Sequence, residues 1–151
     1  MHGIRRRKAH KATPTRKTFE LRLASHPRNV GRVEAFLLKV NRQARLDDGT
    51  MYRLLVACTE AVNNAILHGN KADPEKVVLV TCRLARRCLT LRVKDQGPGF
   101  DASKLPSPLE EQNLMRESGR GVFLMRSLMD EVRFERLKRG SVVQMRICLE
   151  R

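Results

Sequence analysis

The sequence predicts an α+β fold, a two-layer α/β sandwich whose mixed, mostly antiparallel sheet carries its helices on one face. Two kinds of periodicity support this prediction. Some segments alternate apolar and polar residues or are rich in β-branched residues, as strands do, whereas others repeat apolar residues every three or four positions, as helices do. At 151 residues the chain is long enough for one domain with a hydrophobic core and too short for two of ordinary size.

The first strand and the first helix are expected close together in the chain. Residues 18–23 alternate apolar and polar side chains, which is the period of a half-buried strand. In the helix that follows, Ser25 is the expected cap and Pro27 suits the first turn. Apolar residues then recur at helical spacing from Val30 to Val40.

The second helix is expected from about Met51 to His68, after Gly49 and Thr50 interrupt the chain. Its apolar residues fall on one face, and Gly69 is well placed to end it.

The C-terminal half predicts four strands and a third helix. The strands are rich in β-branched residues, and the helix has apolar residues at helical spacing. A polar, proline-containing stretch at 101–118 shows little periodicity and is expected to be a mobile loop. The expected strands cover 77–84, 88–94, 132–137 and 141–149, and the helix begins near 119–121.

The composition is that of a globular protein with an unusual excess of positive charge. The chain has 31 Lys and Arg against 16 Asp and Glu, a formal net charge of +15, which favours acidic partners, nucleic acid or anionic surfaces. Residues 1–17 contain seven of these cations and no acid, so we expect a disordered basic arm before a domain that spans 18–151. Aromatic residues make up 4% and Trp is absent, so a nucleic-acid role is expected only through this arm.

Neither a zinc site nor a membrane segment is expected. The four cysteines, Cys58, Cys82, Cys88 and Cys148, show no Cys-x-x-Cys spacing, and no apolar run approaches the roughly 18 residues of a membrane span. No secretory signal is recognisable at the N-terminus, so a cytoplasmic protein with reduced cysteines is expected. Cys82 and Cys88 could face each other across a hairpin, but a disulfide between them is not expected.

A polar row on the second helix is the first candidate for chemistry. Glu60, Asn64 and His68 are four residues apart and therefore share one face of the helix. The carboxamide oxygen of Asn64 can bind a hard cation such as Mg2+, while the carboxylate of Glu60 can take a proton from a hydroxyl or a water. Taken alone, the row is equally consistent with an ordinary solvated helix face.

The second candidate follows the strand at 88–94. Asp95 can accept a hydrogen bond from an exocyclic amine, while Gly97 and Gly99 let the backbone approach a flat ligand without a Cβ clash. A plain turn would explain these glycines equally well.

The third candidate precedes the last helix. Gly119 and Gly121 stand at the expected N-terminus of this helix, where free backbone N–H groups and the helix dipole favour binding of a phosphate. Arg120 adds a charged hydrogen-bond donor. Many helices begin with glycine and bind nothing, but the three candidates in this order along the chain are hard to obtain by chance.

In this order the three segments resemble the anti-sigma-factor serine/threonine kinases of the GHKL ATPase superfamily, which share the Bergerat, or histidine-kinase-like, ATP-binding fold. Residues 60–69 resemble the N box of that family, 95–100 its G1 box and 118–132 its G2 region. Gly140 and Ser141 stand in the place of its last, weaker box. The similarity spans roughly residues 18–149 and leaves out only the basic arm.

The resemblance implies a role for most of the candidate residues. Glu60 would be the general base for the attacking hydroxyl, and Asn64 would hold Mg2+ between the phosphates. Asp95 would accept from the adenine amino group, supported by Ser141 directly or through water, under a lid formed by residues 101–118. The remaining residues would border the base or cradle the phosphates: Gly97, Gly99, Gly119, Arg120 and Gly121. His68 has no implied role.

The implied function is that of an ATP- and Mg2+-dependent serine/threonine protein kinase that acts as an anti-sigma factor. It would phosphorylate a STAS-type anti-sigma-factor antagonist, sequester a sigma factor in its other partner state, and work as a homodimer. One departure is Glu117, at a position where some family kinases have an arginine. This departure motivates an alternative, a nucleotide-gated binding module that transfers no phosphate. A detached sensor-kinase domain is less well supported, because no dimerisation helix precedes the second helix.

Overall fold

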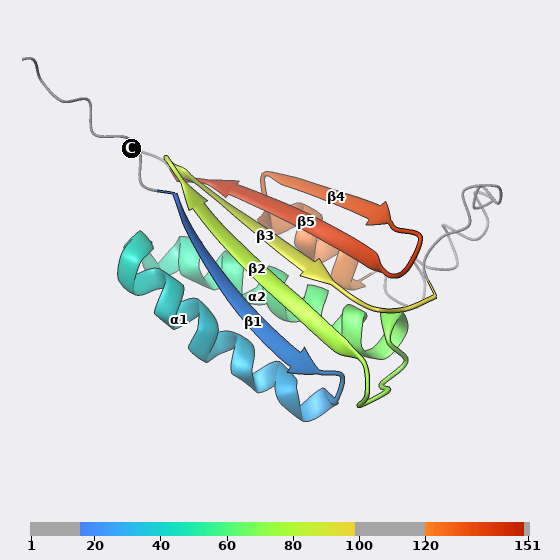
Figure 1. Cartoon of the computed structure of the whole chain (residues 1–151). Helices are drawn as coiled ribbons and strands as arrows, with labels where there is room; N and C mark the ends of the chain where they lie inside the picture. Colours follow the sequence, from blue (N-terminus) through green and yellow to red (C-terminus); the bar gives the residue numbers. More distant parts are fainter. Residues whose placement is uncertain (1–15, 99–119, 150–151) are drawn as a thin grey trace, which may run out of the picture.

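The computed structural model describes residues 16–98 and 120–149. Their strands form one sheet in the order β1-β2-β3-β5-β4, and all four neighbouring pairs are antiparallel. Figure 1 shows the helices packed on one face of this sheet. The predicted α+β sandwich is therefore confirmed. The elements are β1 (Lys17–Ala24), a 3-10 turn (Pro27–Gly31), α1 (Arg32–Ala44), α2 (Asp48–Asn64), a π-turn (Ala65–Gly69), β2 (Val77–Ala85), β3 (Cys88–Lys94), a helix at 120–128, β4 (Glu131–Arg136) and β5 (Ser141–Cys148).

The hydrophobic core lies between the sheet and the helices. Alternate strand residues point into it, and fully buried members include Leu23, Val80, Leu91 and Met145, one from each of four strands. They join Leu54 of α2 in one continuous cluster. Burying one such side chain contributes about 1.5–3 kcal/mol, so this layer holds the helices against the sheet.

The first helical segment begins as the sequence predicts but with a different cap. Pro27 lies in its first turn, and the capping side chain is that of His26, whose Nδ1 accepts from the Arg28 N–H. The prediction that Ser25 caps this helix is wrong. Ser25 is fully buried, and its hydroxyl donates to the carbonyl of Lys76.

The start of α2 also differs from the prediction. Gly49 and Thr50, which were expected to interrupt the chain, lie within the first turn of the helix. Asp47 caps this turn, because its carboxylate accepts from both the backbone N–H and the hydroxyl of Thr50. These hydrogen bonds lower the pKa of Asp47.

The second helix ends in a π-turn and not in the regular α-helical turn expected up to His68. The N–H of Asn70 bonds to the carbonyl of Ala65, five residues back, at 2.8 Å. Such a turn winds more residues than an α-helical turn, so His68 leaves the row that begins with Glu60 and Asn64. His68 is exposed, and the expected polar row is therefore limited to its first two members.

A buried asparagine missed by the sequence analysis ties three segments together. The side-chain amide of Asn70 donates to Ser25 Oγ at 2.6 Å and to the Val77 carbonyl at 3.1 Å, and its Oδ1 accepts from the Gln96 N–H at 2.7 Å. The side chain of Gln96 in turn accepts from the Val77 N–H. Asn70 therefore fixes the loop after β3 against the end of β1 and the start of β2.

Asn70→Ala should lower the free energy of unfolding by about 3 kcal/mol, because the buried Asn70 side chain makes one buried and two partly buried hydrogen bonds that are lost at once. Urea denaturation followed by circular dichroism measures this change. Asn29→Ala is the matched control, because it removes one exposed bond to the Ala24 carbonyl and should cost less than about 1 kcal/mol. Equal effects of the two substitutions would contradict the role given to Asn70.

The cysteines depart from the expectation that all are reduced. Cys88 and Cys148 lie opposite each other in β3 and β5 and form a disulfide. Cys58 and Cys82 are free and buried. The suggested approach of Cys82 to Cys88 is wrong, because the hairpin register pairs Cys82 with Leu91 and turns its side chain into the core.

Candidate functional site

Three segments that are far apart in the sequence meet at one end of the sheet. They are the end of the second helix, the loop that follows β3, and the start of the helix at 120–128. In Figure 1 the end of α2 and the end of β3 lie on the same side of the molecule. The three candidate segments identified in the sequence therefore belong to one site.

Asp95 is the most enclosed polar residue of this site, with only 7% of its surface exposed. Its Oδ1 accepts from the N–H groups of Gly97 at 2.9 Å and Ser141 at 3.0 Å, and its own N–H donates to the Ser141 carbonyl. Among the described residues, no donor contacts Oδ2. The arrangement holds one carboxylate oxygen in place and leaves the other for a ligand donor.

Glycines allow the close approach of the chain around this carboxylate. Gly69 ends the π-turn as expected, and a Cβ added there would overlap the Asp95 carboxylate. A Cβ at Gly97 would overlap the carbonyl of Gly69. Gly140, at φ 92°, brings the β4–β5 turn against the Asp95 backbone in a conformation that side chains disfavour. A larger residue at these positions would displace Asp95 itself.

Glu60 and Asn64 lie one helical turn apart against the start of the helix at 120–128. A Cβ added at Gly121 would lie 2.8 Å from Glu60 Oε2 and 3.4 Å from Asn64 Nδ2. Gly121 is therefore the point of contact between the two helices at the site. A carboxylate, a carboxamide and the N-terminal end of a helix are brought together there, which suits an anion that carries a metal ion.

The side chains of the site fit an Mg2+ ion that is held mainly by the phosphates of a bound molecule and by water. No group of three or more His, Cys, Asp or Glu in ranges 16–98 and 120–149 could form a metal cage. Mg2+ commonly keeps several waters and binds through one or two protein oxygens together with phosphates. The Asn64 carboxamide oxygen is suited to be such a single protein ligand.

The remaining predicted residues are only partly described. Arg120 is exposed at the first position of the helix, next to the buried Gly121. Gly99, Gly119 and the predicted lid at 101–118 lie outside the described residues. The site that can be described is therefore made from Glu60, Asn64, Gly69, Asp95, Gly97, Arg120, Gly121 and Ser141.

Gly121→Ala should weaken binding of Mg-ATP by up to about tenfold, because the new methyl group would displace the end of the Glu60 side chain and contact Asn64. Isothermal calorimetry measures the effect. Gly31→Ala is the matched control, since a Cβ there meets no atom within 4 Å and should leave affinity unchanged. Unchanged affinity in Gly121→Ala would place the ligand elsewhere.

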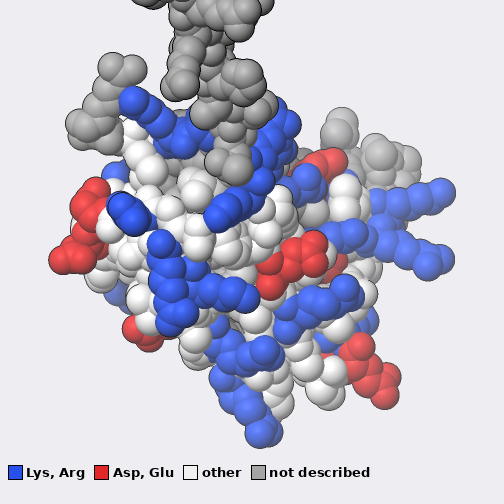
Figure 2. Space-filling model, turned by 60° about the vertical axis from the view of Figure 1, so that its left-hand side comes forward, with Lys and Arg blue, Asp and Glu red and all other residues white. Residues whose placement is uncertain are grey.

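The excess of positive charge is visible on the surface. Figure 2 shows one face on which Lys and Arg side chains are spread widely, with few Asp and Glu between them. Such a surface attracts acidic partners, and the attraction weakens as salt is added. In the described part of the chain, no helix is both long enough and apolar enough to cross a membrane.

A comparison with known protein families matches residues 23–147 to the histidine kinase-like ATPase domain. The chain belongs to this family. The match covers all the described site residues and both helices that carry or adjoin them. The fold class and the family resemblance inferred from the sequence are confirmed.

Individual relatives agree with the family. The chain is 30% identical over 138 residues to serine-protein kinase RsbW of Bacillus licheniformis, which covers 87% of this chain and 86% of that protein. It is 30% identical over 116 residues to the anti-sigma F factor of Anoxybacillus flavithermus, covering 75% and 77%. Sequence similarity thus groups this histidine kinase-like ATPase with serine-protein kinases and anti-sigma factors.

The fold is shared with a solved structure as well. The RsbU and RsbW domains of a Mycobacterium tuberculosis protein match with a TM-score of 0.66 at 18% identity, covering 88% of this chain and 32% of that one. At this identity the match supports the architecture alone.

Proposed function

We propose that this chain is an ATP-dependent serine/threonine protein kinase that acts as an anti-sigma factor. It would phosphorylate a STAS-type antagonist and, in its other partner state, sequester a sigma factor. The observation that carries the proposal is the placement of Glu60 and Asn64 side by side against Gly121. A site that only bound nucleotide would have no use for a carboxylate at this position.

The residues divide the work in this proposal. Oδ2 of Asp95 accepts from the amino group of adenine, because Oδ1 is already occupied by two backbone donors. Asn64 holds Mg2+, which neutralises charge on the phosphates when bound. Glu60 takes the proton from a serine or threonine hydroxyl of the antagonist as the oxygen attacks the terminal phosphoryl group. Gly121 and its neighbours bring the helix N-terminus to the phosphates.

The names of the same relatives support the choice of partners. Proteins named serine-protein kinase RsbW and anti-sigma F factor are similar to this chain over most of its length. We infer that it acts in the cytoplasm, on a phosphorylatable antagonist and a sigma factor, as a homodimer. The basic surface in Figure 2 is suited to acidic segments of such partners.

The test is transfer of labelled phosphate from Mg-ATP to purified STAS-type candidates that contain a serine or threonine at the acceptor position. Transfer to one candidate, together with capture of a sigma factor in its absence, is the expected result. A protein that binds Mg-ATP but neither transfers phosphate to any candidate nor hydrolyses ATP would reject the kinase proposal.

That second outcome would favour a nucleotide-gated binding module. Glu117 motivates this alternative, because it stands where some family kinases have an arginine that could stabilise the transferred phosphoryl group. Glu117 lies outside the described residues. In this alternative ATP exposes a partner surface without chemistry, so sigma-factor capture would depend on ATP but not on Glu60.

A further inference from the structure

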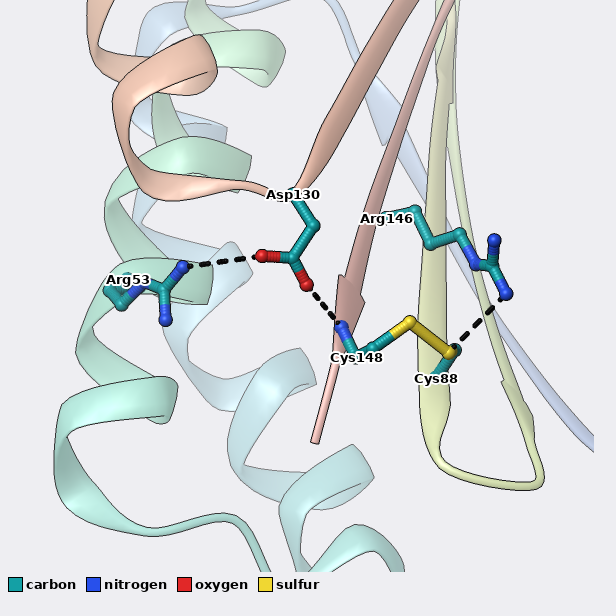
Figure 3. The surroundings of a disulfide bond; sticks show 5 residues. All are labelled: Arg53, Cys88, Asp130, Arg146 and Cys148. Carbon is teal, nitrogen blue, oxygen red and sulfur yellow. Dashed lines mark hydrogen bonds and ion pairs between the residues drawn. A yellow bond between two sulfur atoms is a disulfide. The ribbon is translucent and has the colours of Figure 1, made fainter. Parts of the chain in front are cut away.

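We propose that the Cys88–Cys148 disulfide is a thiol–disulfide exchange site, at which a dithiol reduces the bond and thereby loosens the helix at 120–128. Figure 3 shows the disulfide together with the side chains that connect it to this part of the fold. The exchange stands independently of any activity. Its consequence for nucleotide binding rests on the proposed function.

The disulfide lies on the face of the sheet opposite the core. Leu89 and Ile147, next to the two cysteines along their strands, are fully buried, so Cys88 and Cys148 point to the other face. Cys148 is exposed and Cys88 is half-buried. Cys148 is therefore the cysteine of the pair that a thiolate from solution can approach more readily.

The surroundings of Cys88 favour its departure as a thiolate. Nη2 of Arg146 lies 3.4 Å from Cys88 Sγ, and Arg86 and Arg87 form the exposed hairpin turn just before it. A guanidinium next to a sulfur stabilises the thiolate relative to the thiol. Attack is accordingly directed at Cys148, with Cys88 as the leaving group.

The exchange balances as a two-electron transfer. A thiolate of the dithiol attacks Cys148 Sγ, the S–S bond breaks, and its electron pair stays on Cys88. The second thiolate of the dithiol then attacks the first dithiol sulfur, which is bonded to Cys148 in the mixed disulfide, and releases Cys148 as a thiolate. The dithiol leaves as a disulfide, its two protons can pass to the two cysteines, and the reverse reaction with the oxidised dithiol restores the bond.

Asp130 connects the disulfide to the rest of the fold. The pairing of β4 with β5 begins at Glu131, which lies opposite Arg146. Cys148 is two residues further along β5, so no residue of β4 lies opposite it to accept a hydrogen bond from its N–H. The Asp130 carboxylate takes that place: Oδ2 accepts from the Cys148 N–H at 2.7 Å. The backbone N–H of Asp130 also donates to the Arg146 carbonyl.

Arg53 of α2 completes the connection to the helix at 120–128. Its Nη2 lies 3.8 Å from Asp130 Oδ1, and its Nε donates to the carbonyl of Leu128 at 2.8 Å. One side chain thus holds both the last turn of this helix and the carboxylate that binds Cys148. The disulfide, Asp130, Arg53 and the helix end form a continuous series of contacts, of which Figure 3 shows those from the disulfide to Arg53.

The other end of the same helix is at the nucleotide site. Gly121 packs against Glu60 and Asn64, so any displacement of the helix moves its N–H groups relative to those side chains. The disulfide also closes a loop of 60 residues that includes Asp95 and Gly121. Reduction removes the covalent link between the ends of β3 and β5 and leaves Asp130 and the backbone hydrogen bonds to hold them, so the helix is less firmly fixed in the reduced protein.

The exchange is tested by alkylation of the full chain after equilibration with mixtures of reduced and oxidised dithiothreitol. Mass spectrometry should find Cys88 and Cys148 blocked together as the mixture becomes reducing. Cys58 and Cys82 should react only after denaturation, because burial raises the pKa of each to about 12. Arg146→Gln should slow the exchange. No joint transition of Cys88 and Cys148, at any ratio, would overturn the proposal.

The coupling is tested by amide hydrogen exchange of residues 120–128 and by the melting temperature, in the oxidised and reduced protein. Reduction should increase exchange in this helix and lower the melting temperature by roughly 10 °C. It should also raise the Kd for Mg-ATP about five- to tenfold. The Cys88→Ser, Cys148→Ser double variant should match the reduced protein and not respond to reductant.

The outcomes separate this inference from the proposed function. A wild-type protein that exchanges its disulfide and loosens the helix but binds no nucleotide would reject the proposed function and leave the redox site standing. A protein that binds nucleotide equally well in both redox states, with unchanged protection of residues 120–128, would reject the coupling.

Discussion

Glu60→Gln should reduce phosphoryl transfer to the antagonist by about 10²- to 10⁴-fold while leaving the Kd for Mg-ATP within about twofold of wild type. The substitution keeps the size and hydrogen-bonding reach of the side chain beside Gly121 but removes its ability to take a proton. A loss confined to the transfer rate is the signature of a general base, because such a group acts on the reacting hydroxyl and not on bound nucleotide. Single-turnover transfer with calorimetry on the same preparations separates the two quantities.

The matched control is Glu34→Gln, which removes the same charge from an exposed position in the first turn of α1. It should transfer phosphate at the wild-type rate. Wild-type transfer in Glu60→Gln would show that another group takes the proton. Loss of nucleotide binding in that variant would instead place Glu60 in the binding site and leave its proposed role as a base unsupported.

Asp95→Asn should weaken binding of Mg-ATP by about 100-fold or more, which is the effect of losing roughly 3 kcal/mol. Oδ1 accepts from the Gly97 and Ser141 N–H groups, so the amide of the variant would keep its oxygen there and present its NH2 group at the place of Oδ2. A donor would then face the donor on adenine. Unfolding in urea should show that the variant remains folded, because the two internal hydrogen bonds survive.

Inosine triphosphate sharpens this experiment, because its base carries a carbonyl oxygen in place of the amino group. The wild type should bind it much more weakly than ATP. Asp95→Asn should bind it at least as tightly as ATP, because the NH2 group of the variant can donate to that carbonyl. Asp73→Asn is the control, since within the described ranges the Asp73 carboxylate accepts only from the exposed Glu75 N–H. A variant that still prefers ATP over inosine triphosphate as strongly as wild type would exclude Asp95 as the reader of the amino group.

Most secondary structure could be predicted because the pattern of apolar and polar residues in each element reflects which of its side chains are buried. The strand at Cys88–Lys94 was predicted with the observed bounds, since its alternate residues meet the core and solvent in turn. The errors lie where side chains from other segments decide the local structure. Ser25 has the sequence character of a cap, yet buried Asn70 and the carbonyl of Lys76 recruit its hydroxyl.

The site was predicted as three separate segments, and two of its features could not be seen in the sequence. The first is that Ser141, which the resemblance implies supports Asp95, donates to it through its backbone N–H, because a main-chain donor cannot be recognised from the residue type. The second is that Gly121 touches Glu60 and Asn64, which depends on how two helices pack. Asn70 was missed because it stands in the sequence between Gly69 and Lys71, where an ordinary exposed turn is expected, and its burial depends on contacts with distant segments.

By itself the sequence determined the order of strands and helices, the apolar faces that form the core, and the residue types of the candidate site. These are local properties, fixed by periodicity and by the chemistry of single side chains. Only the tertiary structure decided that Cys88 pairs with Cys148 and not with Cys82, that Asn70 joins three segments, and that Arg53 holds the end of the helix at 120–128. The reason is strand register and helix packing: both depend on contacts between residues far apart in the chain, and a shift of one residue would turn every strand side chain to the opposite face.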